Sequence, residues 1–191
     1  MIEVRIHGRG GQGNVVAAYL LATTAIGEGE YAQAFPSFGA ERRGAPVTAF
    51  VRVAPEPFRR RCQVLHPAFL IIQDEALLQV PGVTDGLLPG GGILVNSKRG
   101  DDELSAMLGR DAAALPASAL AAEFLGRPVP NTALLAAFLT LTQMLPVASL
   151  TKALGHRFKG ELLERNARLI EQAAQRVSPG LWKEQADAAS A

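Results

Sequence analysis

An alternating strand that runs directly into a glycine-rich turn constrains the fold of this chain more than any other feature. Ile2, Val4 and Ile6 alternate with charged residues, a period-2 pattern that predicts a half-buried β-strand. The stretch HGRGGQGN, residues 7–14, follows at once. Residues 14–29 then form a predicted helix that is apolar on nearly all sides and is therefore expected to be buried. Glycines let the backbone turn tightly between a strand and a helix. The sequence therefore predicts that the chain begins with a strand–turn–helix unit of an α/β fold.

The rest of the chain alternates predicted strands with predicted helices. Further strands are expected at 31–35, 47–53, 68–73, 90–97 and 112–116. Further helices are expected at 75–80, 101–109, 117–126, 131–145, within 149–158 and at 160–177. This order predicts a three-layer α/β/α fold with a mostly parallel sheet. The second and third strands lack a crossover helix between them, so antiparallel pairing there should make the sheet mixed.

Chain length and composition fit one globular domain. The chain has 191 residues, of which 48% are apolar and 19% charged, which is enough for a packed core. Residues 1–178 are expected to form a single α/β domain, and residues 179–191 a C-terminal tail that frays unless Trp182 anchors it.

The charge balance and the N-terminus exclude several classes of protein. The net charge is only +1, so no general attraction to nucleic acid or to an anionic membrane is expected. No window approaches the roughly 18 uninterrupted apolar residues of a transmembrane helix. The charged, alternating start is unlike a signal peptide. We therefore expect a cytoplasmic protein without a membrane or nucleic-acid partner.

Metal and cluster chemistry is not expected in this chain. Cys62 is the only cysteine, so it cannot form an internal disulfide or hold an iron–sulfur cluster or zinc ion alone. His7, His66 and His156 lack metal-like spacing. No nucleophile–histidine–carboxylate set is visible either. The sequence predicts no metal site and no catalytic residue.

The glycine turn matches the G-x-G-x-x-G pattern but fails the two common nucleotide-binding motifs. An NAD site needs an acid at the end of the second strand, where this chain has Pro36 and Ser37. A P-loop needs a lysine where Asn14 stands. Three interpretations stay open: a dinucleotide turn of unusual type, a cradle for another phosphate or anion, and a turn that serves packing or a subunit interface.

A second distinctive stretch is AFPSFGAERRGAP, residues 34–46. Phe35 and Phe38 come shortly before Glu41, Arg42 and Arg43, and these three charged residues stand between two glycines. Aromatic rings and guanidinium groups on one loop suit a protein interface or an anionic ligand. The alternative is a solvated loop.

Together these two stretches resemble one family. HGRGGQG, followed about twenty residues later by YAQAFPSFGAERRGAPV, resembles the gamma subunit (gamma domain) of the 2-oxoacid:ferredoxin oxidoreductases, in the pyruvate/ketoisovalerate group. Matching stretches at 70–78, 90–97, 131–138 and 157–173 extend the resemblance to about residue 177.

The resemblance implies an enzyme assembled from several subunits. Such enzymes oxidatively decarboxylate a 2-oxoacid with coenzyme A, giving acyl-CoA, CO2 and two electrons for ferredoxin. Thiamine diphosphate with Mg and the iron–sulfur clusters belong to the alpha, beta and delta subunits, and the gamma subunit packs on them and contributes to the coenzyme A site. This chain is then expected to be inactive alone, with these candidate binding residues: Gly8, Arg9, Gly10, Gly11, Gln12, Gly13, Arg42 and Arg43.

Alternatives remain open at each candidate. The turn could meet a phosphate of coenzyme A or a partner loop, or only pack; the arginines could pair with phosphates or, as we favour, with carboxylates of another subunit. Asp74 could cap the next helix while facing the crevice at the sheet's carboxyl edge, and Asn131 is expected as a helix cap. The alternatives for the whole chain are an indolepyruvate-type oxidoreductase subunit and a stand-alone coenzyme A- or nucleotide-binding protein.

Overall fold

One mixed sheet organises the computed structural model, which describes residues 1–38 and 45–190. Within these residues the sheet contains β1 (Ile2–Arg9), β2 (Tyr31–Phe38), β3 (Pro46–Ala54), β4 (Phe69–Ile72), β5 (Gly92–Asn96) and β6 (Ala112–Leu115). The strand order is β2-β3-β1-β4-β5-β6. Strands β1, β4, β5 and β6 are parallel neighbours, and β3 pairs antiparallel with both β1 and β2. The α/β fold, the mostly parallel sheet and the antiparallel pair of β2 with β3 are confirmed.

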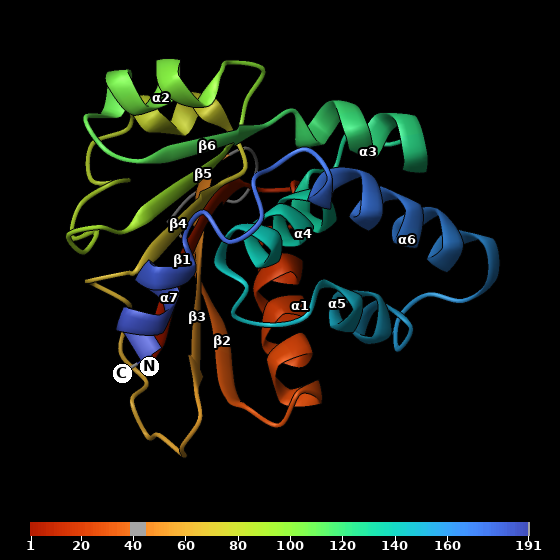
Figure 1. The fold of residues 1–191 in the computed structure, drawn as a ribbon, viewed down its shortest axis with the longest axis horizontal. Helices are drawn as coiled ribbons and strands as arrows, with labels where there is room; N and C mark the ends of the chain where they lie inside the picture. Colours follow the sequence, from red (N-terminus) through yellow and green to blue (C-terminus); the bar gives the residue numbers. More distant parts are fainter. Residues whose placement is uncertain (39–44, 191) are drawn as a thin grey trace.

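Helices cover both faces of the sheet. They are α1 (Asn14–Gly27), the 3-10 helix η1 (Glu75–Gln79), α2 (Asp101–Leu108), α3 (Ala117–Leu125), α4 (Asn131–Thr142), α5 (Val147–Leu154), α6 (Gly160–Ala174) and α7 (Lys183–Ser190). Figure 1 shows α1, α3, α4, α5 and α6 on one side of the sheet and α2 on the other. No helix in the described part of the chain is long and apolar enough to cross a membrane.

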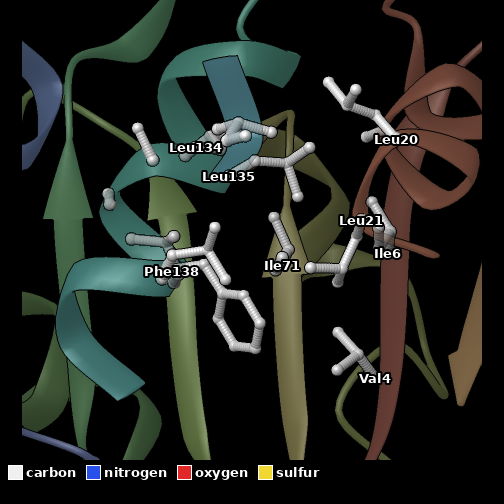
Figure 2. Close-up of a cluster of buried hydrophobic side chains, with 14 of the residues drawn as sticks. Val4, Ile6, Leu20, Leu21, Ile71, Leu134, Leu135 and Phe138 are labelled. Carbon is white, nitrogen blue, oxygen red and sulfur yellow. The ribbon is translucent and has the colours of Figure 1, made fainter. Parts of the chain in front are cut away.

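The larger core lies between the sheet and helices α1 and α4. Val4 and Ile6 of β1 and Ile71 of β4 point toward Leu21 of α1 and Phe138 of α4 (Figure 2). Eleven of the twelve residues of α4 are buried, because α3, α5 and α6 pack around it on the side away from the sheet. A helix that is apolar on all sides is expected in such a central position.

A smaller core on the opposite face covers only β4, β5 and β6. Leu70 and Ile93 pack there against Leu77 of η1, Val83 and Leu104 of α2. On β1 and β3 the same face carries mostly polar or charged side chains: Glu3, Arg5, His7, Thr48 and Arg52. Besides side chains of the sheet, carbonyl groups of two loops accept hydrogen bonds from Arg5 and Arg52 on this face.

Three expectations about single elements are corrected. Strand β2 continues through Pro36 to Phe38, which is tolerated because β2 is an edge strand. Helix α1 is not buried on all sides, since Tyr19 is 48% and Ile26 58% exposed; α4 is the helix that the fold encloses. Asn131 is the first residue of α4 and not its N-cap, although its Oδ1 still accepts from the Thr132 N–H at 2.8 Å.

The C-terminal residues are helical rather than frayed. Trp182 is 1% exposed and stacks on Phe69 with ring centroids 5.9 Å apart. Helix α7 follows it and lies beside the start of β1, so that the two chain ends meet (Figure 1). The Met1 ammonium donates to the carbonyl oxygens of Ala189 at 3.0 Å and Ser190 at 3.2 Å. A cation at the carboxyl end of a helix is favourable, so the N-terminus helps to hold α7.

Candidate functional site

The glycine turn lies at a point where the chain leaves two neighbouring strands in opposite directions. After β1 the chain enters α1, which packs in the larger core, and after β4 it enters η1, which packs in the smaller core on the other face. The two strands are parallel neighbours, and the Gln73 N–H donates to the His7 carbonyl at 2.8 Å. In open α/β sheets, ligands bind in the crevice beyond the carboxyl ends at such a switch point. The candidate site is therefore the crevice between the ends of β1 and β4.

The turn has one part that packs and one part that faces out. Gly13 has φ +77°, and a Cβ there would lie 2.7 Å from Asn131 Nδ2 of α4, so both the backbone and the contact require glycine. Gly11 also has a positive φ of +96°, but a Cβ there would meet nothing within 4 Å among the described residues. Gly10 and Gly11 are exposed. Packing explains Gly13, whereas the Gly10–Gly11 backbone is accessible to another molecule.

Arg9 and Gln12 converge on Asp74 across the crevice. Arg9 Nε lies 2.7 Å from Asp74 Oδ2, and Gln12 Nε2 lies 3.5 Å from the same oxygen. The backbone N–H of Arg9 donates to Gln12 Oε1 at 2.7 Å, which fixes the shape of the turn. Asp74 Oδ1 accepts from the Ala76 N–H at 3.0 Å. Asp74 thus caps η1 and faces the crevice at once, as the sequence indicated.

Arg42 and Arg43 lie outside the described residues. The residues that follow this segment are placed beside the turn: Gly10 N–H donates to the Ala45 carbonyl at 3.3 Å, and Pro46 is opposite Arg9 in the β1–β3 pairing. On the far side of the segment, Phe38 pairs with Val47. Phe38 and Ala45, on either side of residues 39–44, therefore both lie near the carboxyl end of β1.

His7, near the end of β1, is a buried neutral imidazole. Burial, together with the nearby positive charge of Arg5, lowers the pKa of His7 to about 3. Arg5 Nε donates to His7 Nε2 at 2.9 Å, and Arg5 itself is held by the carbonyls of Val83 and Asp85 at 2.8 and 2.7 Å. An imidazole with this pKa is not protonated near neutral pH and has its acceptor nitrogen occupied. The structure thus gives His7 a structural role.

Two polar residues near the crevice were not among the predicted site residues. Gln73 is fully buried, and neither its amide nitrogen nor its amide oxygen has a hydrogen-bond partner among the described residues. Asn96 Nδ2 donates to the Gln73 carbonyl at 2.9 Å, and Asn96 Oδ1 accepts from the Ser118 N–H at the start of α3. Their signal in the sequence is a polar residue directly after a buried apolar strand, the same signal that identified Asp74.

The arrangement can hold an anion but offers little acid–base chemistry. It combines a guanidinium, an accessible glycine backbone and the N-terminus of α1, all of which favour negative charge. Within residues 1–38 and 45–190, no group of three or more His, Cys, Asp and Glu side chains is placed to hold a metal ion. Cys62 is exposed, on the loop beyond β3.

Comparisons with known proteins agree on one family. Residues 3–176 match the family model of pyruvate ferredoxin/flavodoxin oxidoreductase. The pyruvate/ketoisovalerate oxidoreductases common subunit gamma of Thermococcus kodakarensis is 44% identical over 176 residues, which cover 91% of this chain and 95% of that protein. The crystal structure of pyruvate oxidoreductase subunit PORC from Thermotoga maritima matches with a TM-score of 0.83 and 32% identity, covering 92% of this chain and 96% of that chain.

The same fold recurs inside a larger chain. The 2-oxoglutarate:ferredoxin oxidoreductase from Magnetococcus marinus, solved with 2-oxoglutarate, coenzyme A and succinyl-CoA bound, matches with a TM-score of 0.73. The identity is 24%, and the match covers 98% of this chain but 31% of that chain. At this identity the likeness concerns the fold alone.

Proposed function

The chain belongs to the pyruvate ferredoxin/flavodoxin oxidoreductase family as the gamma subunit of a multi-subunit 2-oxoacid:ferredoxin oxidoreductase, and we propose that its glycine turn forms part of the coenzyme A site of the assembled enzyme. The enzyme would oxidise pyruvate or 2-ketoisovalerate. The 2-oxoacid loses CO2, its acyl group forms a thioester with coenzyme A, and two electrons pass to ferredoxin. An indolepyruvate-type enzyme fits the relatives less well, because the similar proteins carry pyruvate or ketoisovalerate in their names.

The proposed division of labour leaves the redox chemistry to other subunits. We assign thiamine diphosphate with Mg and the iron–sulfur clusters to alpha, beta and delta partners, with ferredoxin as the electron acceptor and the cytoplasm as the location. The support in this chain is its single cysteine and the neutral, occupied imidazole of His7. The isolated chain is expected to have no activity.

The ion pair between Arg9 and Asp74 is the observation that carries the coenzyme A proposal. It joins the carboxyl ends of β1 and β4 at 2.7 Å, and Arg9 directly precedes the exposed Gly10 and Gly11. Coenzyme A carries several phosphate groups, which arginine and glycine-rich backbone bind well. Asp74 holds Arg9 in one orientation, so less side-chain freedom is lost when the anion arrives.

Steady-state kinetics of the assembled enzyme test this proposal. Arg9→Gln should raise the KM for coenzyme A about tenfold, the cost of losing one charge-assisted hydrogen bond, while the KM for the 2-oxoacid stays within twofold. Asp74→Asn removes the ion pair but keeps the Arg9 charge, so it should raise the KM for coenzyme A clearly less than Arg9→Gln does. Arg168→Gln, on an exposed position of α6, is the control for charge.

Two results would overturn the proposal. An unchanged KM for coenzyme A in Arg9→Gln would reduce the turn to packing. Equal increases in Arg9→Gln and Asp74→Asn would mean that Arg9 only holds the turn in shape. Recovery of the native protein without a thiamine-binding partner would contradict the subunit assignment itself.

A further inference from the structure

Strand β2 leaves one side of the sheet without a neighbouring strand. Its inner edge pairs with β3 over Tyr31–Phe38, and no strand pairs with its outer edge among the described residues. Alternate residues of such an edge present N–H and C=O groups that a further strand can pair with. None of the side chains at 32–37 is fully buried, in contrast to β3, where all side chains at 49–54 are. The side chains of β2 are therefore more accessible than those of β3.

A groove lies beside the first residues of β2. Its volume is about 450 Å3, and its lining residues are Tyr31, Ala32, Gln33, Pro57, Phe58, Arg59 and Arg61. Ala32 packs toward the larger core, whereas Gln33 contacts Arg52 on the opposite face of the sheet. The groove therefore borders the beginning of β2, at residues 31–33. The second wall is the loop 57–61 that follows β3.

Arg52 fixes the loop beside the strand. Its buried guanidinium donates to Glu3 Oε1 at 2.6 Å and to the Cys62 carbonyl at 2.7 Å, and it lies 5.6 Å from the centre of the Phe35 ring. Its Nη1 also donates to Gln33 Oε1 at 3.4 Å. One side chain thus connects β1, β2 and the loop. Both walls of the groove are held in place without a ligand, which lowers the entropic cost of binding.

The loop supplies a positive charge that is not neutralised within the described residues. Arg60 lies 3.7 Å from Glu3 Oε1, whereas neither Arg59 nor Arg61 has an ion pair in the described part of the chain. Both are exposed. A second copy of this chain on the edge would bring like charges together, which disfavours self-pairing. An acidic segment would be favoured at the same place.

We propose that the open edge of β2 receives an extended, acidic segment of a partner subunit, which pairs with β2 as an added strand and places its carboxylates against Arg59 and Arg61. The inference rests on the proposed function, because it needs the other subunits. Addition of a strand is a common mode of peptide recognition, in which backbone hydrogen bonds give affinity and side-chain contacts give specificity. Here Tyr31 and Phe58, which line the same groove as Arg59 and Arg61, offer an apolar surface beside the two charges.

Amide hydrogen exchange gives a direct test of strand addition. Exchange is measured in the full chain alone and in the enzyme purified with its partner subunits. We expect alternate amides at 31–38 to exchange at least roughly tenfold more slowly in the complex. Unchanged exchange across β2 overturns the proposal. The proposal is also overturned if the β2 amides of the isolated chain are protected from exchange and this protection grows with the chain's concentration, because a second copy would then occupy the edge.

Charge reversal tests the arginines. The variant Arg59→Glu/Arg61→Glu, co-expressed with the partner subunits and recovered through a tag on this chain, should bring down about tenfold less partner at low salt. The control Arg168→Glu/Arg176→Glu makes the same charge change at exposed positions at α6 and just beyond it. Both variants should keep a thermal midpoint within about 2 °C of the wild type. Equal recovery with both variants overturns the proposal, whereas a wild-type chain that recovers no partner contradicts the subunit assignment instead.

Discussion

Arg9 Nε and Asp74 Oδ2 lie 2.7 Å apart although 65 positions separate the two residues in the sequence. The pair joins the end of β1 to the end of β4, where the chain leaves two parallel neighbours toward opposite faces of the sheet. Asp74 also caps η1. A single carboxylate therefore connects the glycine turn, the two strand ends and the helix that follows.

Two substitutions at Asp74 should separate its two roles. Asparagine caps a helix about as well as aspartate, so Asp74→Asn removes only a partly exposed ion pair and should lower the free energy of unfolding by less than about 1 kcal/mol. Asp74→Ala also removes the cap and should cost about 1 kcal/mol more. Urea denaturation measures both values. Equal losses in the two variants would contradict the separation.

Gly13 should tolerate no side chain. Gly13→Ala places a methyl group at φ +77° and 2.7 Å from Asn131 Nδ2, so we expect a loss of about 1–3 kcal/mol in the free energy of unfolding. Gly13→Ala combined with Asn131→Ala relieves the contact but not the backbone strain, and should recover part of the loss. Gly27→Ala is the control, because it lies in α1 with nothing within 4 Å among the described residues. For Gly27→Ala we expect the free energy of unfolding to rise by up to about 1 kcal/mol.

The buried His7 should make stability depend on pH. Its pKa is about 3 in the folded chain, against an ordinary value of 6.5. Between these values the unfolded state binds more protons, so the free energy of unfolding decreases as the pH falls from about 6.5 toward 3, by up to about 1.4 kcal/mol per pH unit from this group. In His7→Gln the amide oxygen still accepts from Arg5, but the titration is gone.

Urea denaturation at about pH 7 and about pH 5 checks this expectation. The decrease in the free energy of unfolding from about pH 7 to about pH 5 should be smaller in His7→Gln than in the wild type. His156→Gln, at an exposed position, should retain the wild-type dependence. The same pH dependence in all three proteins would rule out His7 as its source.

The sequence predicts elements well where its periodicity changes sharply. The alternation of Ile2, Val4 and Ile6 ends at the glycine turn, and the structure places β1 and α1 on either side of it. The lack of a crossover helix between β2 and β3 correctly predicts their antiparallel pairing. The rule that parallel strands end at one edge also puts Asp74 at the crevice. Local patterns suffice for these features because each depends on neighbours in the chain.

Features that depend on tertiary packing were not predictable in the same way. Helices α1 and α4 are both apolar all round, and only the layer order shows that α4 is enclosed while Ile26 of α1 is exposed. Helix α7 is polar and buries one alanine, so it depends on Trp182 and on Met1 from the opposite end of the chain. Arg9 ends β1 and Asp74 follows β4, so their pairing depends on how two strands from distant parts of the sequence are placed. A sequence pattern gives no distance between such residues.

Trp182 should control whether α7 docks. Its ring stacks on Phe69 at 5.9 Å, and a Cβ at Gly92 would lie 2.6 Å from it, so the indole fills a site shaped around it. Trp182→Ala should lower the free energy of unfolding by about 3–5 kcal/mol, whereas Leu181→Ala, at a residue 51% exposed, should change it by less than about 0.5 kcal/mol.

Fluorescence gives an independent measurement, because Trp182 is the only tryptophan. Its emission should have the short wavelength of a buried indole in the native chain and shift to longer wavelength on unfolding. A truncated chain ending at Trp182 lacks α7 and should shift the native emission part of the way, since the larger core still holds the ring from the Phe69 side. Native emission already at the wavelength of solvated tryptophan would mean that Trp182 itself is not docked in solution.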